Sequence, residues 1–299
     1  MEGSEIEIGN LTDVGRKRTH NEDYYGLFRF GPDEVLALVA DGMGGHASGE
    51  VASRLAVEAI QEIYEKERGE KDVLMALKSA FEITNFTILQ KSLEKEEWSG
   101  MGTTATALVL KGEEVFIGHV GDSRAYLLRD SAISQLTKDH SLVERMVEQG
   151  LLNRDEADRH PQRNVIYQTL GVNRDLEPEL LGPIPFSPHD TFLLCTDGLS
   201  NLVSDQEIMG MVRENPPQKA CESLIDLANQ RGGHDNITLQ ILTVKAKAPK
   251  SHQPFLEGRR YLLVVIISIL SLLFILNGLS LLNPEFFKKI QTEIKGWWK

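Results

Sequence analysis

The chain has 299 residues, a formal net charge of −12 and a hydrophobic content of 41%, which is ordinary for a globular protein. Residues 1–250 hold 26 Lys or Arg against 41 Asp or Glu, so this part has no general electrostatic reason to bind nucleic acid but can collect cations. The two cysteines, Cys195 and Cys221, form no disulfide framework, which suits a reducing cytoplasm.

Eight segments have the composition of β-strands, being rich in β-branched and aromatic residues and bounded by Gly, Asp or Pro. In chain order they cover residues 5–13, 24–30, 34–40, 104–110, 114–120, 124–130, 191–197 and 236–244. Helical patterns cover residues 49–68, 72–93, 204–213 and 217–231. The last pair begins with a capping box, in which Ser204 is the N-cap and Glu207 follows three residues later.

The order of these elements indicates the fold class. Two helices follow the third strand and two more precede the last strand, so helices and strands do not alternate one by one. This order favours an α+β fold of antiparallel sheets covered by helix pairs over a doubly wound parallel sheet. Residues 140–185 interrupt the strand series with short helical and loop pieces, and we expect this insertion to carry function.

An apolar segment near the C-terminus, residues 261–282, contains no charged side chain. As a helix at about 1.5 Å per residue it would span roughly 33 Å, close to the hydrocarbon thickness of a bilayer. We therefore expect a transmembrane helix here rather than a buried core helix. The polar, Pro-containing stretch 246–260 is then a linker from a globular domain at residues 1–245, and residues 283–299 form a short tail.

The N-terminal sequence MEGSEIEIGN is acidic and lacks the apolar stretch of a signal peptide. The expected location is accordingly the cell membrane, with a single-pass anchor and residues 1–245 in the cytoplasm. Lys and Arg residues precede the apolar segment, in agreement with the positive-inside rule, but lysines also follow it, so this support is weak.

The stretch VADGMGGHASGE, residues 39–50, places a carboxylate at a strand end and then four glycines. Such a loop can cradle a phosphate, or its carboxylate can hold a metal while the glycines let the backbone come close. A P-loop is excluded, because Glu50 and Val51 stand where the Lys and the hydroxyl residue are required. The metal hypothesis is therefore favoured.

The same pattern of an acid at a strand end recurs along the chain. A single acid of this kind is usually a turn former or a helix cap. Five such places on different strands suggest a common site: Glu22 with Asp23, Asp41, Asp122, Asp197 and Asp235. If these strand ends converge, the like charges repel unless cations neutralise them, and carboxylates with backbone carbonyls suit Mg²⁺ or Mn²⁺. No Cys-x5-Arg, G-x-S-x-G or H-E-x-x-H motif supports a rival chemistry.

Seven motifs occur in a fixed order: RTHNED, DGMGG, GTTA, GDSRAY, TKDHS, CTDGL and HDNIT. Together they resemble the protein phosphatase 2C family, the metal-dependent serine/threonine phosphatases, in its bacterial form. The resemblance covers about residues 6–244. It implies an αββα sandwich, which agrees with the predicted order of elements.

The resemblance also implies a site for two or three Mn²⁺ or Mg²⁺ ions. Asp41 would bridge the first two ions. The other ligands would be Asp197 and Asp235 on the first ion, Glu22 and the Gly42 carbonyl on the second, and Asp122 with Asp197 on a weaker third ion. Arg18 would bind the substrate phosphate, for which a guanidinium offers two parallel hydrogen bonds.

The implied reaction is in-line attack of a metal-bridged hydroxide on phosphoserine or phosphothreonine without a covalent intermediate. Met43 occupies the position of a histidine that resembles a general acid in eukaryotic relatives, so the proton must come from a metal-bound water or another residue. Residues 144–180 correspond to the family's flap. The implied partners are phosphorylated proteins and an opposing bacterial serine/threonine kinase, itself membrane-bound. Two alternatives stay open: a silent phosphoprotein-binding module, and a phosphatase dedicated to one regulatory partner.

Overall fold

The computed structural model describes residues 4–44 and 47–246, together with five helical residues of the C-terminal part: Glu285, Lys288, Lys289, Thr292 and Glu293. The chain divides into two units, Met1–Lys247 and Ala248–Lys299. The architecture below is that of the first unit.

Two antiparallel sheets form the centre of this unit. The first has the order β2-β3-β5-β6-β9, with β4 paired to the end of β3. Its strands are β2 (Asp23–Arg29), β3 (Glu34–Met43), β4 (Gly102–Thr103), β5 (Ala105–Lys111), β6 (Glu114–Val120) and β9 (Glu179–Pro185). The second has the order β1-β11-β10-β7-β8. Its strands are β1 (Ser4–Asp13), β11 (Ile237–Ala246), β10 (Thr191–Cys195), β7 (Arg124–Arg129) and β8 (Ala132–Gln135).

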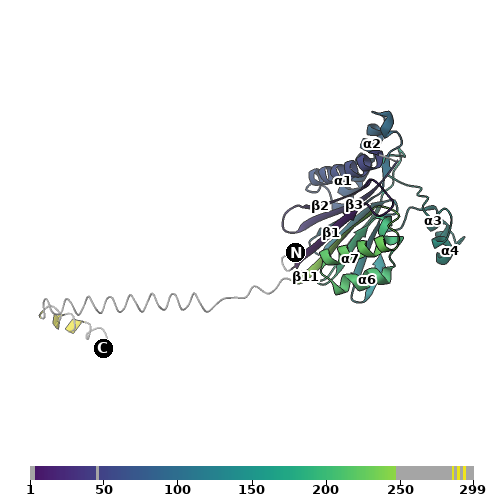
Figure 1. Cartoon of the computed structure of the whole chain (residues 1–299). Coiled ribbons are helices and arrows are strands. Elements are labelled where there is room, and N and C mark those ends of the chain that lie inside the picture. Colours follow the sequence, from purple (N-terminus) through teal and green to yellow (C-terminus); the bar gives the residue numbers. More distant parts are fainter. Residues whose placement is uncertain (1–3, 45–46, 247–284, 286–287, 290–291, 294–299) are drawn as a thin grey trace. The chain divides into compact units, whose positions relative to one another are not determined.

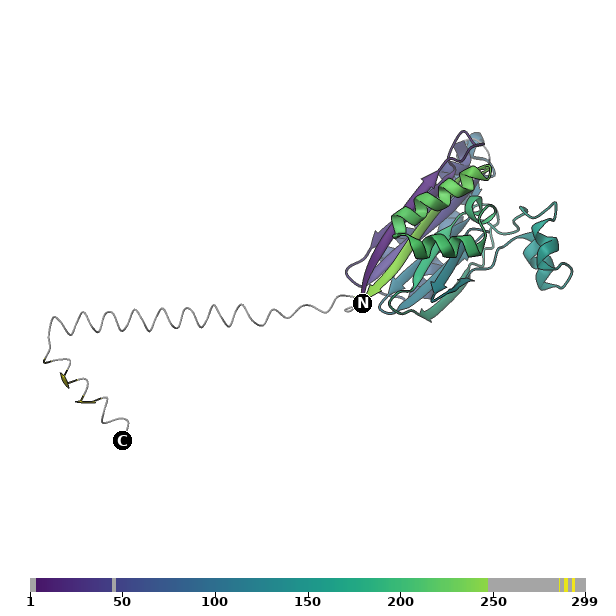
Figure 2. The same cartoon turned by 60° about the horizontal axis from the view of Figure 1, so that its bottom comes forward.

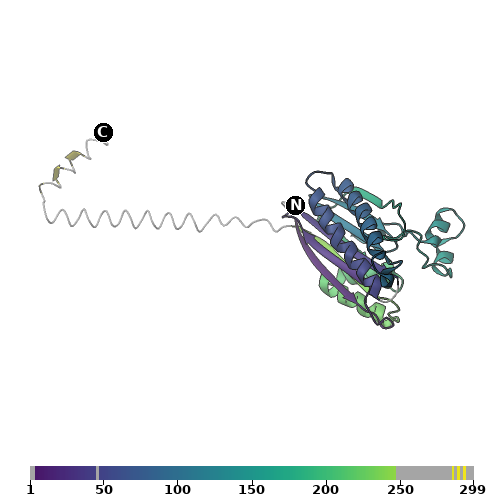
Figure 3. The ribbon, with the colours of Figure 1, turned by 90° about the horizontal axis from the view of Figure 1, so that it is seen from above.

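A helix pair covers the outer face of each sheet, which confirms the predicted αββα sandwich. The helices α1 (Ala47–Glu67) and α2 (Val73–Ser92) pack on the first sheet, and α6 (Asp205–Glu214) and α7 (Pro217–Gln230) pack on the second. Figure 1 and Figure 3 show the two pairs on opposite sides of the strands. A third apolar cluster lies between the sheets. The predicted capping box of Ser204 and Glu207 is present at the start of α6.

The central strand β3 explains why its sequence is an unbroken apolar run. Residues 35–40 are fully buried, because alternate side chains face α1 on one side and the second sheet on the other. Burial on both faces removes the alternation of polar and apolar residues that marks a strand with one wet face. This buried strand carries the acid Asp41 to the end of the sheet.

Several elements differ from the sequence prediction, and the short strands β4 and β8 were not predicted. The strand β9 lies in the region expected to hold only helices and loops, because Gly182, Pro183 and Pro185 hide its pattern and an edge strand tolerates proline. The strand β10 ends at Cys195, and Asp197 opens the short helix α5 (Asp197–Ser200) instead of ending the strand. The strand β3 extends past residue 40 to Met43 by pairing with β4.

Two short helices of the insertion, α3 (Leu142–Glu148) and α4 (Arg154–Asp158), stand apart from the sandwich, as Figure 2 shows. A 3-10 turn, η1 (Glu96–Trp98), follows α2. Within the described part of the chain, no helix is both long and apolar enough to cross a membrane. The predicted transmembrane segment, residues 261–282, lies outside the described residues, as does the linker after residue 246.

Candidate metal centre

The predicted site residues occupy loops and strand ends of both sheets. Arg18 and Glu22 lie in the loop between β1 and β2, and Asp41 and Gly42 belong to the last three residues of β3. The other three positions come from distant parts of the sequence: Asp122 in the β6–β7 turn, Asp197 at the start of α5, and Asp235 directly before β11.

Ion pairs join the N-terminal loop to the last strand. The Arg18 Nη2 atom lies 2.9 Å from Asp235 Oδ2, and Arg18 Nη1 lies 3.7 Å from Glu22 Oε2. The Arg18 side chain remains half exposed. Arg18, the residue predicted to bind the substrate phosphate, thus lies beside two predicted metal ligands. One of them, Asp235, is 217 residues away in the sequence.

The carboxylates are close enough to perturb one another. Burial, and then the charges of Asp23 and Asp197, raise the pKa of Asp41 well above its usual value. Burial and the charge of Asp197 do the same to Asp122, while burial and Asp235 raise the pKa of Asp197. Buried like charges favour the neutral form unless a cation compensates them. The convergence required by the sequence hypothesis is therefore present.

Threonines of the GTTA motif hold the Asp41 backbone in place. The Asp41 N–H donates to Thr104 Oγ1 at 2.9 Å, and the Thr104 N–H donates to the Asp41 carbonyl at the same distance. The Thr103 hydroxyl donates to that carbonyl as well, at 2.8 Å. With its own N–H and C=O engaged, Asp41 is oriented by backbone hydrogen bonds, independently of any ligand of its carboxylate.

The glycines after Asp41 permit a close backbone approach. A Cβ on Gly42 would lie 2.1 Å from the Gly49 carbonyl oxygen and 2.7 Å from the Glu22 carbonyl oxygen. A Cβ on Gly49 would lie 2.9 Å from the Glu22 carboxylate. No side chain fits in these places, so the start of α1 can come against Glu22 only because both positions are glycine.

Asn236 organises the N-terminal loop, a role that the sequence analysis did not assign. Its Oδ1 accepts from the Glu22 N–H at 2.8 Å, and its Nδ2 donates to the carbonyls of Val14 and His20 at 3.0 and 2.9 Å. The side chain is buried. Its only signal in the sequence is its place in the HDNIT motif, next to Asp235.

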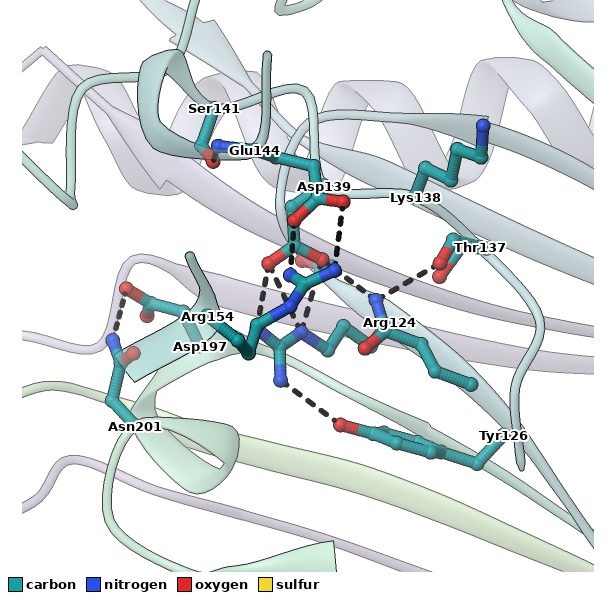
Figure 4. A network of polar contacts seen from close by, with 12 residues as sticks. Arg124, Tyr126, Thr137, Lys138, Asp139, Ser141, Glu144, Arg154, Asp197 and Asn201 are labelled. Carbon is teal, nitrogen blue, oxygen red and sulfur yellow. Dashed lines mark hydrogen bonds and ion pairs between the residues drawn. The ribbon is translucent and has the colours of Figure 1, made fainter. Parts of the chain in front are cut away.

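A second polar network was also missed by sequence reasoning. The Arg124 guanidinium forms a bidentate pair with Asp139, with Nη2 2.6 Å from Oδ2, and its Nη1 donates to the Tyr126 hydroxyl at 3.1 Å. Figure 4 shows this pair near Asp197, whose Oδ2 accepts from Asn201 Nδ2 at 3.0 Å. The Arg124 charge opposes the effect of burial on the pKa values of Asp122 and Asp197.

The residues present fit a hard divalent cation. Within the described residues, the buried Asp197 Oδ1 atom has no hydrogen-bond partner, and an orphaned carboxylate oxygen is a ready cation ligand. Among the described residues, one group of three potential ligand atoms lies within 4.8 Å of one another, and it consists of His119, His140 and Glu179. The predicted carboxylates do not form a group this close. His119 is fully buried in β6.

Comparisons with known proteins agree with this fold and these motifs. The sequence model of the protein phosphatase 2C family matches residues 14–224. The serine/threonine phosphatase stp of Listeria monocytogenes is 36% identical over 235 residues, covering 77% of this chain and 93% of that protein. The protein phosphatase PhpP of Streptococcus pneumoniae is 36% identical over 244 residues, covering 80% and 98%.

Solved structures give the same result. The serine/threonine phosphatase PstP/Ppp of Mycobacterium tuberculosis has a TM-score of 0.73 at 35% identity, covering 81% of this chain and 99% of that one. A structure of the PstP catalytic domain in complex with two manganese ions has a TM-score of 0.71 at 35% identity, with coverage of 81% and 99%. The chain belongs to the protein phosphatase 2C family and is a metal-dependent protein serine/threonine phosphatase.

Proposed function

We propose that the acidic centre between the two sheets holds two or three Mn²⁺ or Mg²⁺ ions and is the catalytic centre. The ligands would be Asp41, Asp197 and Asp235 for one ion, Asp41, Glu22 and the Gly42 carbonyl for the next, and Asp122 with Asp197 for a third. The observation that carries the proposal is the convergence of carboxylates from both sheets: burial and then the charges of Asp197, Asp122 and Asp235 raise the pKa of Asp41.

The chain's own residues have three tasks in the reaction. The carboxylates bind the cations, which supply a hydroxide near neutral pH and stabilise charge on the phosphoryl oxygens. Arg18 turns its guanidinium from Asp235 to the phosphate of phosphoserine or phosphothreonine and orients it for in-line attack. The Asp41 backbone is held by its hydrogen bonds to Thr104, so the point from which the carboxylate extends is fixed before substrate binds.

Met43 cannot donate a proton to the leaving serine or threonine. It lies at the end of β3 with 39% of its surface exposed, next to Gly42. An exposed thioether at this place leaves room for the substrate and for water. The proton therefore comes from water in the site or from another residue, and the Met43 position serves contact instead of acid catalysis.

The membrane anchor belongs to the same proposal. Residues 261–282 form a single transmembrane helix, joined through the linker 246–260 to a cytoplasmic catalytic domain at residues 1–245, with residues 283–299 as a tail. This proposal rests on the uncharged apolar run in the sequence. The tether raises the effective concentration of substrates near the membrane, including those of an opposing membrane serine/threonine kinase.

Hydrolysis of a phosphothreonine peptide by the full-length chain tests the centre. We expect turnover with Mn²⁺ that EDTA abolishes and that Asp197→Ala removes. The matched control is Asp226→Ala, an exposed acid on α7, which keeps activity. A folded chain that binds the peptide but shows no turnover at any Mn²⁺ concentration would contradict the proposal and support the silent binding module. Turnover of a single cellular phosphoprotein, with no general peptide activity, would support a dedicated phosphatase.

A further inference from the structure

A group of three side chains lies outside the proposed catalytic centre. His119 on β6, His140 between β8 and α3, and Glu179 on β9 each place one potential ligand atom within 4.8 Å of the other two. Both histidines are buried, and their ring centroids are 4.9 Å apart. The proposed reaction uses none of the three, so their proximity requires another explanation.

Hydrogen bonds argue against a metal site in this group. The His119 Nε2 atom lies 3.0 Å from the Lys138 carbonyl, and its Nδ1 lies 2.9 Å from the Thr106 hydroxyl, which also donates to the Ser123 carbonyl at 3.0 Å. The His140 Nδ1 atom accepts from the Gly121 N–H at 3.2 Å. Both ring nitrogens of His119 and the Nδ1 of His140 thus already have protein partners, which a metal ion would have to displace.

These same bonds join two segments that are distant in sequence. One is the segment Thr137–Ser141, which leads from β8 into α3, and the other is the turn that carries Asp122. The Lys138 N–H donates to Glu179 Oε2 at 3.1 Å, while its carbonyl accepts from His119. Adjacent strands thus hold both polar groups of one residue in this segment.

His140 holds the turn itself. Its own N–H donates to the Gly121 carbonyl at 2.7 Å, while its ring nitrogen accepts from the Gly121 N–H. One residue therefore satisfies both backbone groups of Gly121, the residue directly before Asp122. With 7% of its surface exposed, His140 leaves water little access to replace these bonds.

His140 also holds the neck of the insertion that contains α3 and α4. Its carbonyl accepts from the Tyr167 N–H at 2.9 Å, and the two rings pack with centroids 5.6 Å apart. Two residues further into the insertion, the Leu142 N–H donates to the Val165 carbonyl at 2.8 Å. The chain segment that enters the insertion and the segment that leaves it thus contact each other at His140.

We propose that His140 is a positioning residue that keeps the Asp122 turn and the neck of the insertion in one arrangement. The inference rests on the proposed function in taking Asp122 as a ligand of the third ion. Loss of the imidazole acceptor leaves the Gly121 N–H buried without a partner, so the turn must shift or open. The Asp122 carboxylate and the insertion are then no longer held in a fixed position relative to each other.

The test compares three variants of the full-length chain. His140→Leu removes the acceptor, while His140→Asn keeps an oxygen at the place of Nδ1. His160→Leu is the matched control: its Nδ1 also accepts a backbone N–H, that of Gln162 at 3.2 Å, but within the insertion itself. The readouts are amide hydrogen exchange at Gly121, calorimetric titration with Mn²⁺, and kcat and KM for a phosphothreonine peptide and for p-nitrophenyl phosphate.

We expect His140→Leu to speed exchange at the Gly121 amide and to weaken the weakest Mn²⁺ binding step, each by about tenfold or more. We infer that a peptide reaches the insertion and a small ester does not, so KM for the peptide should rise more than KM for p-nitrophenyl phosphate. His140→Asn should recover most of each effect, and His160→Leu should leave the Gly121 exchange and Mn²⁺ binding unchanged.

Three results would overturn the proposal. The first is a His140→Leu chain with unchanged exchange and Mn²⁺ binding. The second is faster exchange alone, with Mn²⁺ binding and both KM values unchanged, which would reduce His140 to a fold contact. The third is loss of a tightly bound Zn²⁺ from the variant by metal analysis, which would make the group a metal site. Failure of the proposed centre looks different: Asp122→Asn would leave Mn²⁺ binding intact while the Gly121 exchange still responds to His140.

Discussion

The strand β3 carries an acid near each end, and the side chains around the two acids have opposite charges. At the start of the strand, the Glu34 carboxylate accepts from the Tyr64 hydroxyl at 2.6 Å and from Arg68 Nη1 at 2.8 Å, with Lys111 Nζ at 3.6 Å. At the other end, the neighbours that act on Asp41 are Asp23, Asp197, Asp122 and Asp235, all of the same charge.

The difference separates a structural acid from a functional one. Around Glu34 the chain supplies its own cations, and the Arg68 guanidinium also packs over the Phe30 ring at 4.7 Å. Burial, with the hydrogen bond to Glu34, raises the pKa of the Tyr64 hydroxyl, so this end stays a closed network. Around Asp41, the half-exposed Arg18 contacts Asp235 and Glu22, and Arg124, paired with Asp139, acts on Asp122 and Asp197 through its charge. The positive charge that neutralises these carboxylates must therefore come from bound cations.

The largest expected effect is on catalysis at the uncompensated end. Asp41→Asn should lower kcat for a phosphothreonine peptide by about 10³-fold or more, because it removes the ligand that both ions would share. In EDTA the free energy of unfolding should not fall, since one buried like charge is gone. Steady-state kinetics and urea unfolding measure the two quantities. A variant that is destabilised in EDTA yet active would put Asp41 in the class of Glu34.

The next effect is a pH dependence of the metal-free protein. Asp23 pairs with Asp41 across β2 and β3, and burial raises its pKa to about 7. The unfolded value is about 3.9, so the folded chain holds this proton more tightly and unfolding releases it. Between about pH 4 and pH 7 the free energy of unfolding should therefore fall as pH rises, by up to about 4 kcal/mol. Urea titrations in EDTA at pH 5, 6 and 7 measure the slope.

Asp23→Asn is the control for that slope. Without the ionisable group, the free energy of unfolding should change much less between pH 5 and pH 7. An equal slope in the variant would show that the proton is released elsewhere in the acidic centre.

At Glu34 we expect a similar loss of stability, but no loss of catalytic activity. Glu34→Gln leaves Arg68 beside a neutral partner and should lower the free energy of unfolding by about 3 kcal/mol, the cost of breaking a buried pair. The kcat of the folded variant should stay within about threefold of wild type, since Asp41 lies seven residues away along the strand. Inactivity of a fully folded Glu34→Gln chain would break the comparison.

The smallest effect concerns Arg18, the chain's own cation at the acidic end. Arg18→Ala should raise KM for the phosphothreonine peptide by about tenfold, with little change in stability because the side chain is half exposed. Arg18→Lys should recover the effect only in part, because an ammonium cannot form the bidentate contact. An unchanged KM in both variants would remove Arg18 from the substrate site.

Much of this molecule could be predicted before any coordinates. The grouping of helices in pairs predicted the sandwich, and the spacing of acids at strand ends predicted a cation site at their common edge. The edge strand β9 was missed because its prolines and Gly182 mask the strand pattern. Asn236 and Arg124 lie within the motifs HDNIT and GDSRAY, but their roles were missed because a motif does not show which distant residue a polar side chain contacts.

Local chemistry was therefore readable from the sequence, because strand composition, capping and acid placement act over a few residues. The sequence did not show which acid of β3 would have neutralising partners. Tyr64 and Arg68 contact Glu34 from α1 and the loop after it, about 30 residues away. The joint between Gly121 and His140 likewise exists only once β6, β9 and the neck of the insertion are packed together. Contacts between distant segments depend on packing and register, and these are properties of the folded chain.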